Sequence, residues 1–186
     1  VPKYSNPQGY TYSEETVKRF AHLKPAAPDF RIYWDNAYSI HHLYDENQDF
    51  LVEILEECTK AGNPDIVYKF TSTSKVSFPG SGIAAVAASK ANLEDFRSYM
   101  QIQTIGHDKL NQLRHVKFFK DLDGLHAHMR KHAAIIRPKF EAVLETLEKE
   151  LGELGIASWS KPVGGYFISF NAEKGCAKAI VAKCKE

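Results

Sequence analysis

The sequence lacks the features that mark membrane-spanning, secreted and nucleic-acid-binding proteins. No apolar run approaches the roughly 20 residues of a transmembrane helix, and the first residues do not form a signal peptide. The cysteines, Cys58, Cys176 and Cys184, are odd in number and lack the spacing of a metal site, so reduced thiols in the cytoplasm are the simplest interpretation. The formal net charge of +1 gives no electrostatic reason to expect nucleic acid or a membrane surface as a partner.

What the sequence contains is the composition of an ordinary globular protein. Of its 186 residues, 44% are hydrophobic and 25% are charged, which is enough for one large core or two small ones. Apolar runs at residues 31–34 and 65–70 predict strands. Between them, residues 49–61 show apolar side chains at helical spacing. The order strand, helix, strand favours a parallel pair with a right-handed crossover.

A polar segment at residues 71–82 separates the second strand from another apolar run at residues 83–88. The connection has no helical periodicity, so we expect this third strand to run antiparallel to the second. The segment offers hydroxyl groups, Lys75 and a Pro-Gly-Ser-Gly turn that could bind an anion; a polar loop with a solvated lysine is the simpler alternative. Because ligands of such sheets bind beyond the carboxyl ends of the strands, we expect Asp35 and Lys75 to lie near each other.

The second half of the chain is predicted to be mostly helical. A long periodic run extends over residues 125–151, with Pro138 as a candidate kink, and strands are predicted at 157–159 and 166–170. This order indicates the start of a second, smaller domain. The side chains expected on buried helix faces before residue 120 are Leu93, Phe96, Met100, Leu110, Leu113, Val116 and Phe119.

Three short motifs occur in order along the chain: Asn6-Pro7-Gln8-Gly9, then Asp35 with Tyr38 three residues later, then Ser72-Thr73-Ser74-Lys75. This ordered set resembles the fold type I enzymes that depend on pyridoxal 5'-phosphate (PLP). Within these enzymes it is most similar to the class I aminotransferases, in an atypical branch related to aspartate aminotransferase. The resemblance continues to Lys161-Pro162-Val163-Gly164-Gly165-Tyr166-Phe167 and covers nearly the whole chain.

The resemblance implies an α/β fold. Residues 1–119 would form part of the PLP-binding large domain, with a mostly parallel sheet, one antiparallel strand and flanking helices. Residues 120–186 would form a long linking helix and the start of a small α+β C-terminal domain. Because relatives are much longer and the chain has no starting methionine, we expect an internal fragment cut at both ends, and we expect this fragment to be inactive alone. Relatives are homodimers.

The implied reaction moves the amino group of an amino acid such as aspartate to a 2-oxo acid such as 2-oxoglutarate. Lys75 would form a Schiff base with PLP and then act as the base that moves a proton. Asp35 would pair with the pyridinium nitrogen of the cofactor. Tyr38 and Asn6 would donate hydrogen bonds to its phenolic oxygen.

The phosphate of PLP would be bound by Ser72 and, as a weaker candidate, by Ser74. Most relatives also carry an arginine at the position that aligns with Gly82, and this sequence does not. The loss removes a charge-assisted contact of the stronger kind. Either the backbone amides of residues 80–82 and a helix end replace the arginine, or the phosphate is bound more weakly.

Three alternatives follow from the same residues. A PLP-dependent lyase or decarboxylase would share the cofactor residues and differ in its substrate contacts. A transcriptional regulator could use an aminotransferase-like domain only to sense PLP. A metal site would need the histidines His41, His42, His126, His128 and His132; no Asp, Glu or Cys completes such a set nearby, so we do not expect one.

Overall fold

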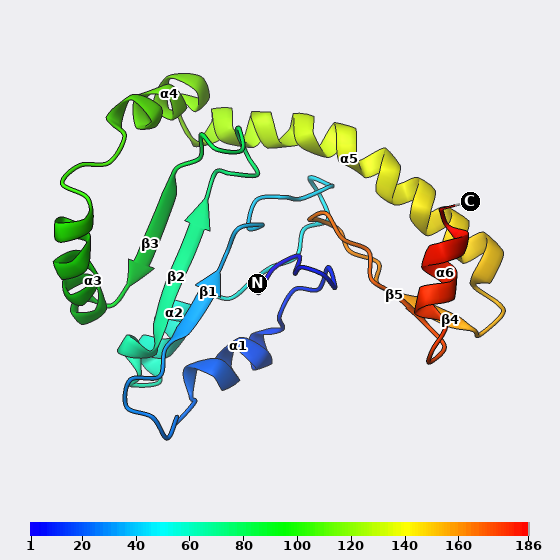
Figure 1. Ribbon diagram of the computed structural model, residues 1–186, viewed down its shortest axis with the longest axis horizontal. Helices are drawn as coiled ribbons and strands as arrows, with labels where there is room; N and C mark the ends of the chain where they lie inside the picture. The colour runs from blue at the N-terminus through cyan, green and yellow to red at the C-terminus, as the bar shows by residue number, and fades with distance from the viewer. Residues whose placement is uncertain (186) are drawn as a thin grey trace.

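The computed structural model describes residues 1–185. Its centre is a three-stranded sheet in the order β1-β2-β3, formed by β1 (Ile32–Asp35), β2 (Val67–Ser72) and β3 (Ala84–Ala88) (Figure 1). β1 pairs with β2 in parallel, and β2 pairs with β3 antiparallel. The predicted mixed sheet is therefore confirmed.

Two short helices cover one face of the sheet beside β1 and β2. α1 (Glu14–Ala21) begins at Ser13, whose hydroxyl accepts the Thr16 N–H at 3.2 Å and so satisfies one free amide of the first turn. α2 (Ile54–Lys60) starts five residues later than predicted, because the Glu53 carboxylate caps it. The buried core between the helices and the sheet consists of Val17, Ala21, Trp34, Ile54, Cys58, Ile66 and Val67.

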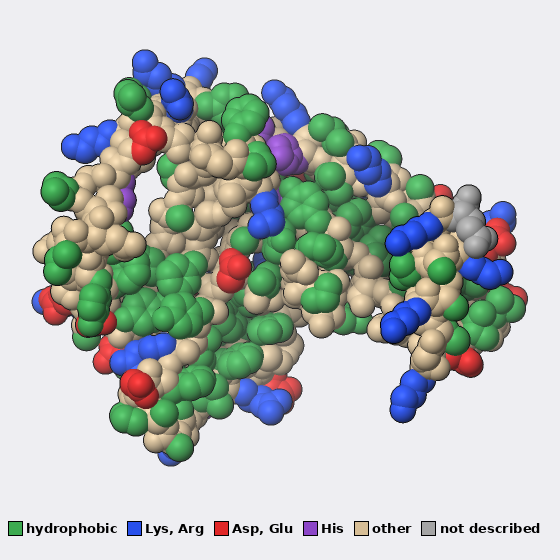
Figure 2. Space-filling model, viewed as in Figure 1, with side chains coloured by type: hydrophobic (Ala, Val, Ile, Leu, Met, Phe, Trp, Pro, Cys, Tyr) green, Lys and Arg blue, Asp and Glu red, His purple; other side chains and the backbone are tan. Residues whose placement is uncertain are grey.

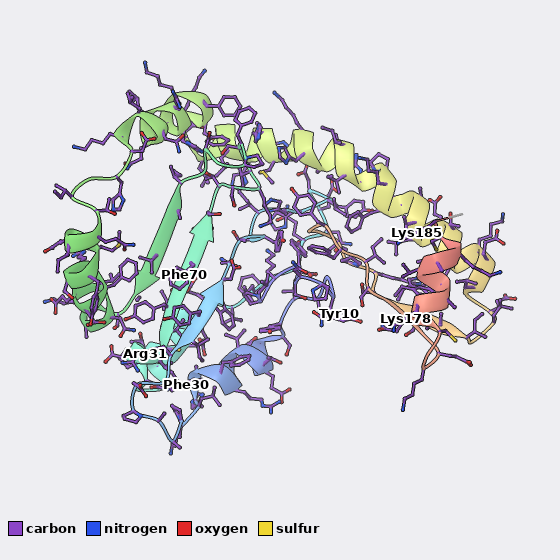
Figure 3. All side chains as sticks on the ribbon, viewed as in Figure 1. Tyr10, Phe30, Arg31, Phe70, Lys178 and Lys185 are labelled. Carbon is purple, nitrogen blue, oxygen red and sulfur yellow. The ribbon has the colours of Figure 1, made fainter. Side chains whose placement is uncertain are left out.

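The second predicted strand also starts late. The 3₁₀ helix η1 (Pro64–Ile66) occupies the first residues of the predicted run, since Pro64 at a helix start has the backbone geometry of that turn. On the side of the sheet that carries Tyr33, the ring of Tyr33 stacks on Phe70 and Tyr68 at centroid distances of 5.6 and 6.0 Å. Figure 3 labels Phe70 on β2 within this aromatic surface.

Three helices follow the sheet: α3 (Lys90–Gln103), α4 (Lys109–Phe119) and α5 (Leu122–Leu151). α5 continues through Pro138 and ends, as predicted, just before Gly152. The predicted apolar face of α4 is wrong. Leu110, Leu113 and Val116 are exposed, and the buried side chains of α4 are Asn111 and His115.

Beyond α5, β4 (Ala157–Trp159) and β5 (Phe170–Ala172) form an antiparallel pair, followed by α6 (Ala177–Lys183). Figure 1 shows α5 running from α4 and the loops near the sheet to this small unit. The strand predicted at 166–170 is wrong except at Phe170, because the preceding segment packs against the loops near the sheet, where Gly164 forms an isolated bridge with His42. The boundary between residues 119 and 120 stays a prediction.

Figure 2 shows hydrophobic side chains gathered over β1, β2 and α2 and again beneath α5, with charged side chains around them. None of the helices within residues 1–185 is both long enough and apolar enough to cross a membrane.

Candidate active site

The carboxyl ends of β1 and β2 meet at one edge of the sheet. Asp35 lies opposite Phe70 in the register, and the Asn36 N–H donates to the Phe70 carbonyl at 2.8 Å. The Asp35 side chain is exposed at this edge, and its Oδ1 accepts the Ala37 N–H at 3.0 Å. The loops that follow the two strands, residues 36–43 and 73–77, therefore leave the sheet side by side.

Tyr38, only 3% exposed, is the aromatic centre of this edge. Its ring packs against His41 at 5.6 Å, Tyr166 at 5.8 Å and Phe167 at 6.2 Å between centroids. The Lys75 ammonium nitrogen lies 5.2 Å from the centre of the Tyr38 ring, within the range of a cation–π contact. The structure thus brings Tyr38 and Lys75 together, and their roles toward a cofactor stay predictions.

Lys75 lies at the apex of a helix-like turn, residues 73–77, which we call the Lys75 turn. The N–H groups of Val76 and Ser77 both donate to the Thr73 carbonyl, at 2.9 and 2.8 Å. The Lys75 side chain is exposed. Within residues 1–185 neither Lys75 nor Asp35 takes part in an ion pair. An amine and a carboxylate are therefore both available at the same sheet edge.

Ser72 and Ser74 present adjoining hydroxyls just before Lys75. Their Oγ atoms are 2.7 Å apart, and the Ser74 N–H points to the Ser72 Oγ at 3.4 Å. Gly82 packs against them, because a Cβ at this position would come 3.1 Å from the N and Cα of Ser74. A side chain in place of Gly82 would press on this backbone, so Ser74 would have to shift by a few tenths of an ångström to admit it.

Asn6 is exposed in a turn at residues 5–9, and no hydrogen bond joins it to the other predicted site residues among those described. The turn is nevertheless fixed in place. Gly9 has a φ of +74°, and a Cβ there would lie 2.6 Å from the Phe167 carbonyl oxygen. Since Phe167 also touches Tyr38, the Asn6 turn is connected to the sheet edge through the segment 162–167.

Two of the histidines considered as metal ligands instead contact the backbone of the Lys75 turn. No group of three or more His, Cys, Asp or Glu side chains within residues 1–185 could hold a metal ion. His41 Nε2 lies 3.2 Å from the Lys75 carbonyl, and His128 Nε2 lies 2.8 Å from the Val76 carbonyl. His115, which the sequence did not single out, contacts the hydroxyls of Thr73 and Ser77. These contacts join residues far apart in the chain, so no local spacing signals them.

Burial sets the protonation of the aromatic and imidazole groups near this edge. Burial lowers the pKa of His41, with Lys75 and His132 adding charge repulsion. Burial also raises the pKa of Tyr166, so its hydroxyl stays protonated and donates to the Lys75 carbonyl at 3.3 Å. Both groups face the Lys75 turn as neutral hydrogen-bond donors at neutral pH.

A nearby cavity of about 690 Å³ lies on the other side of the Lys75 turn, between that turn, α4 and α5. Asn111 and His115 line it together with Phe78, Phe118 and His128. The cavity borders the turn through Ser77 and is therefore adjacent to the predicted site, although Lys75 itself is not among the side chains that line it.

Comparison with known proteins gives one consistent result. All 186 residues match the model of the family described as aspartate amino-transferase. An aspartate aminotransferase of Corynebacterium glutamicum is 44% identical over the whole chain, which spans 43% of that relative. The crystal structure of an aspartate transaminase from Corynebacterium glutamicum superimposes with a TM-score of 0.94 at 43% identity, over all of this chain and 43% of that one.

A more distant structure shares the fold. The α-aminoadipate aminotransferase of Thermus thermophilus, solved with N-(5'-phosphopyridoxyl)-L-leucine, has a TM-score of 0.72 at 24% identity over 94% of this chain and 43% of its own. The chain therefore spans less than half the length of the relatives it matches. The resemblance that the motifs predicted is confirmed, and the chain belongs to the aspartate aminotransferase family, a family of enzymes.

Proposed function

We propose that the chain is part of a PLP-dependent aminotransferase in which Lys75 binds the cofactor. The observation that carries this proposal is the position of Lys75: its amine lies over the buried Tyr38 ring, at the edge where β1 delivers Asp35. Lys75 is exposed and has no ion-pair partner among residues 1–185. With the exposed Asp35 carboxylate at the same sheet edge and the two adjoining serine hydroxyls, it offers the donor set that PLP requires.

Bound PLP would hold the substrate nitrogen and accept electron density from its Cα. The Asp35 carboxylate would bind the protonated ring nitrogen, since a nearby negative charge favours the protonated form. The Tyr38 hydroxyl would donate to the phenolic oxygen, and the Asn6 amide would do the same from its turn. The Lys75 Nζ would take the proton from the substrate Cα and return it to a neighbouring carbon.

The phosphate would be bound by neutral donors rather than by an arginine. Ser72 and Ser74 supply hydroxyls, and the close packing of Gly82 on Ser74 brings the backbone of residues 80–82 beside them. These donors carry no positive charge and cannot form the bidentate ion pair that an arginine forms with a phosphate. We therefore expect weaker phosphate binding than an arginine in the same place would give.

For the complete protein we propose aspartate as amino donor and 2-oxoglutarate as acceptor, supported by a relative named aspartate aminotransferase. No feature of the described residues favours a lyase, a decarboxylase or a PLP-sensing regulator. The homodimer and the cytoplasmic location stay predictions.

To test this, the chain is titrated with PLP while its absorbance is recorded. It is then reduced with borohydride, and the labelled lysines are identified by peptide mapping. We expect a saturable visible band and a pyridoxyl mass on the Lys75 peptide, both lost in Lys75→Ala. Lys90→Ala, which changes a lysine that is 90% exposed on the surface of α3, is the matched control and should keep both. Equal labelling of several surface lysines without a saturable band would overturn the proposal.

A further inference from the structure

We propose that His115 is a positioning residue for Lys75, and that it holds the Lys75 turn together with His41 and His128. The inference rests on the proposed role of Lys75. The three histidines come from three separate parts of the fold, the loop after β1, α4 and α5, and all three reach the same five-residue turn.

His115 bridges the two ends of the turn. Its ring is 7% exposed, and its Nε2 lies 2.9 Å from the Thr73 Oγ1 and 2.8 Å from the Ser77 Oγ. These hydroxyls stand two residues before and two residues after Lys75. One imidazole nitrogen of α4 therefore lies within hydrogen-bond distance of hydroxyls on both sides of the lysine.

The tautomer of His115 follows from its other nitrogen. Nδ1 lies 2.9 Å from the Asn111 carbonyl, which can only accept, so Nδ1 carries the proton. With that proton on Nδ1, Nε2 can accept a hydrogen bond from a hydroxyl of the turn. Phenylalanine could fill the same volume but would leave both hydroxyls without this partner.

The turn is anchored on its far side as well. The Thr73 Oγ1 accepts the Ile83 N–H at 2.9 Å, and the Asn111 amide donates to the Ser81 carbonyl at 2.7 Å. The polar face of α4 thus contacts both ends of the segment between β2 and β3. This explains why α4 buries Asn111 and His115 and leaves its leucines exposed.

The remaining two histidines bind consecutive carbonyls. His41 donates from Nε2 to the Lys75 carbonyl at 3.2 Å, and His128 donates to the Val76 carbonyl at 2.8 Å. With these peptide groups held, the direction of the Lys75 Cα–Cβ bond is set by the turn, and only the side-chain torsions of Lys75 remain free. Orientation of this kind matters, because a small misplacement of a reacting group can cost about 100-fold in rate.

The experiment compares His115→Phe with His115→Gln. Phenylalanine keeps the ring volume without a nitrogen, and glutamine restores an acceptor oxygen at the distance of Nε2 from the backbone. His107→Phe, at an exposed histidine before α4, is the control. Two quantities are measured: the pyridoxyl label on Lys75 relative to other lysines, and the hydrogen-exchange protection of the Val76 and Ser77 amides without PLP.

We expect His115→Phe to lower the selective label and the amide protection about tenfold each, and His115→Gln to recover most of both. The control should match the unaltered chain. If His115→Phe matches it too, the positioning role is refuted while the role of Lys75 stands. If the unaltered chain shows no selective label, the proposed function fails, and the role of His115 toward Lys75 fails with it. The hydrogen-exchange measurement then still decides whether His115 holds the turn. Loss of folding in both variants would overturn the inference.

Discussion

His42 provides a direct test of how burial controls the stability of this chain. Its Nδ1 lies 2.8 Å from the hydroxyl of Tyr4, which is fully buried. Burial raises the pKa of Tyr4 to about 12, so the hydroxyl remains a donor and His42 is the acceptor. Burial also lowers the pKa of His42 to about 4, and Lys3 adds charge repulsion. Smaller contributions to the pKa of His42 come from His126, His41 and Asp49.

The sign of the effect follows from proton binding. Between pH 6.5 and about 4 the unfolded chain binds a proton at His42 that the folded chain does not, so stability falls as the pH falls. Above pH 6.5 neither state binds this proton, so the stability shows no loss from His42. The loss is roughly 2 kcal/mol at pH 5 and levels off at about 3 kcal/mol below pH 4.

The assay compares urea unfolding of the unaltered chain and His42→Asn at pH 7 and pH 5. Asparagine keeps an acceptor oxygen for the Tyr4 hydroxyl and cannot be protonated. We expect the free energy of unfolding to fall by roughly 2 kcal/mol less in the variant over this interval. His107→Asn, at an exposed histidine, should behave as the unaltered chain does. Equal pH dependence in His42→Asn, or an imidazole titration by NMR near pH 6.5, would refute the reasoning.

Four further substitutions test the packing, the backbone conformation and a helix cap. Ile54→Ala empties a fully buried position and should lower the free energy of unfolding by about 3 kcal/mol, measured in urea. Gly165→Ala, with φ at +79° and a Cβ 2.7 Å from that of Tyr4, should cost at least about 2 kcal/mol, whereas Gly62→Ala, with a φ of +70° and no neighbour within 4 Å, should cost about 1 kcal/mol by thermal unfolding. Ser13→Ala removes the α1 cap and should cost about 1 kcal/mol by the same measurement; no change would contradict the capping role.

The mixed sheet could be predicted because local patterns determine it. A helix between two apolar runs favours a parallel crossover, and a connection without a helix allows an antiparallel return. Asp35 and Lys75 then fall at the carboxyl ends of adjacent strands, which is where the structure places them. The predicted starts of α2 and β2 were too early. Glu53 caps α2 at Ile54, and the turn at Pro64 delays β2; both signals involve only one or two residues.

The support around Lys75 could not be predicted for a different reason. The sequence pattern predicts an amphipathic α4 with buried leucines, but tertiary contacts bury Asn111 and His115 instead. The partners of His115 lie 38 and 42 residues away in the sequence, and those of His41 and His128 lie 34 and 52 residues away. Helical spacing carries no information about such contacts, so the sequence did not single out His115 and offered His41 and His128 only as candidate metal ligands, which we did not expect to form a site.

The segment 162–167 explains why the candidate site needs both ends of the chain. Gly164 and Gly165 lie so close to Tyr4 that a Cβ on either would come within 2.3 and 2.7 Å of its side chain, respectively. Two residues after Gly165, Phe167 contacts both Gly9 and Tyr38. The hydroxyl of the intervening Tyr166 donates to the Lys75 carbonyl. The turn that carries Asn6 and the turn that carries Lys75 are thus held against the same short segment. A substitution that moves this segment should disturb both turns at once, although neither contains the altered residue.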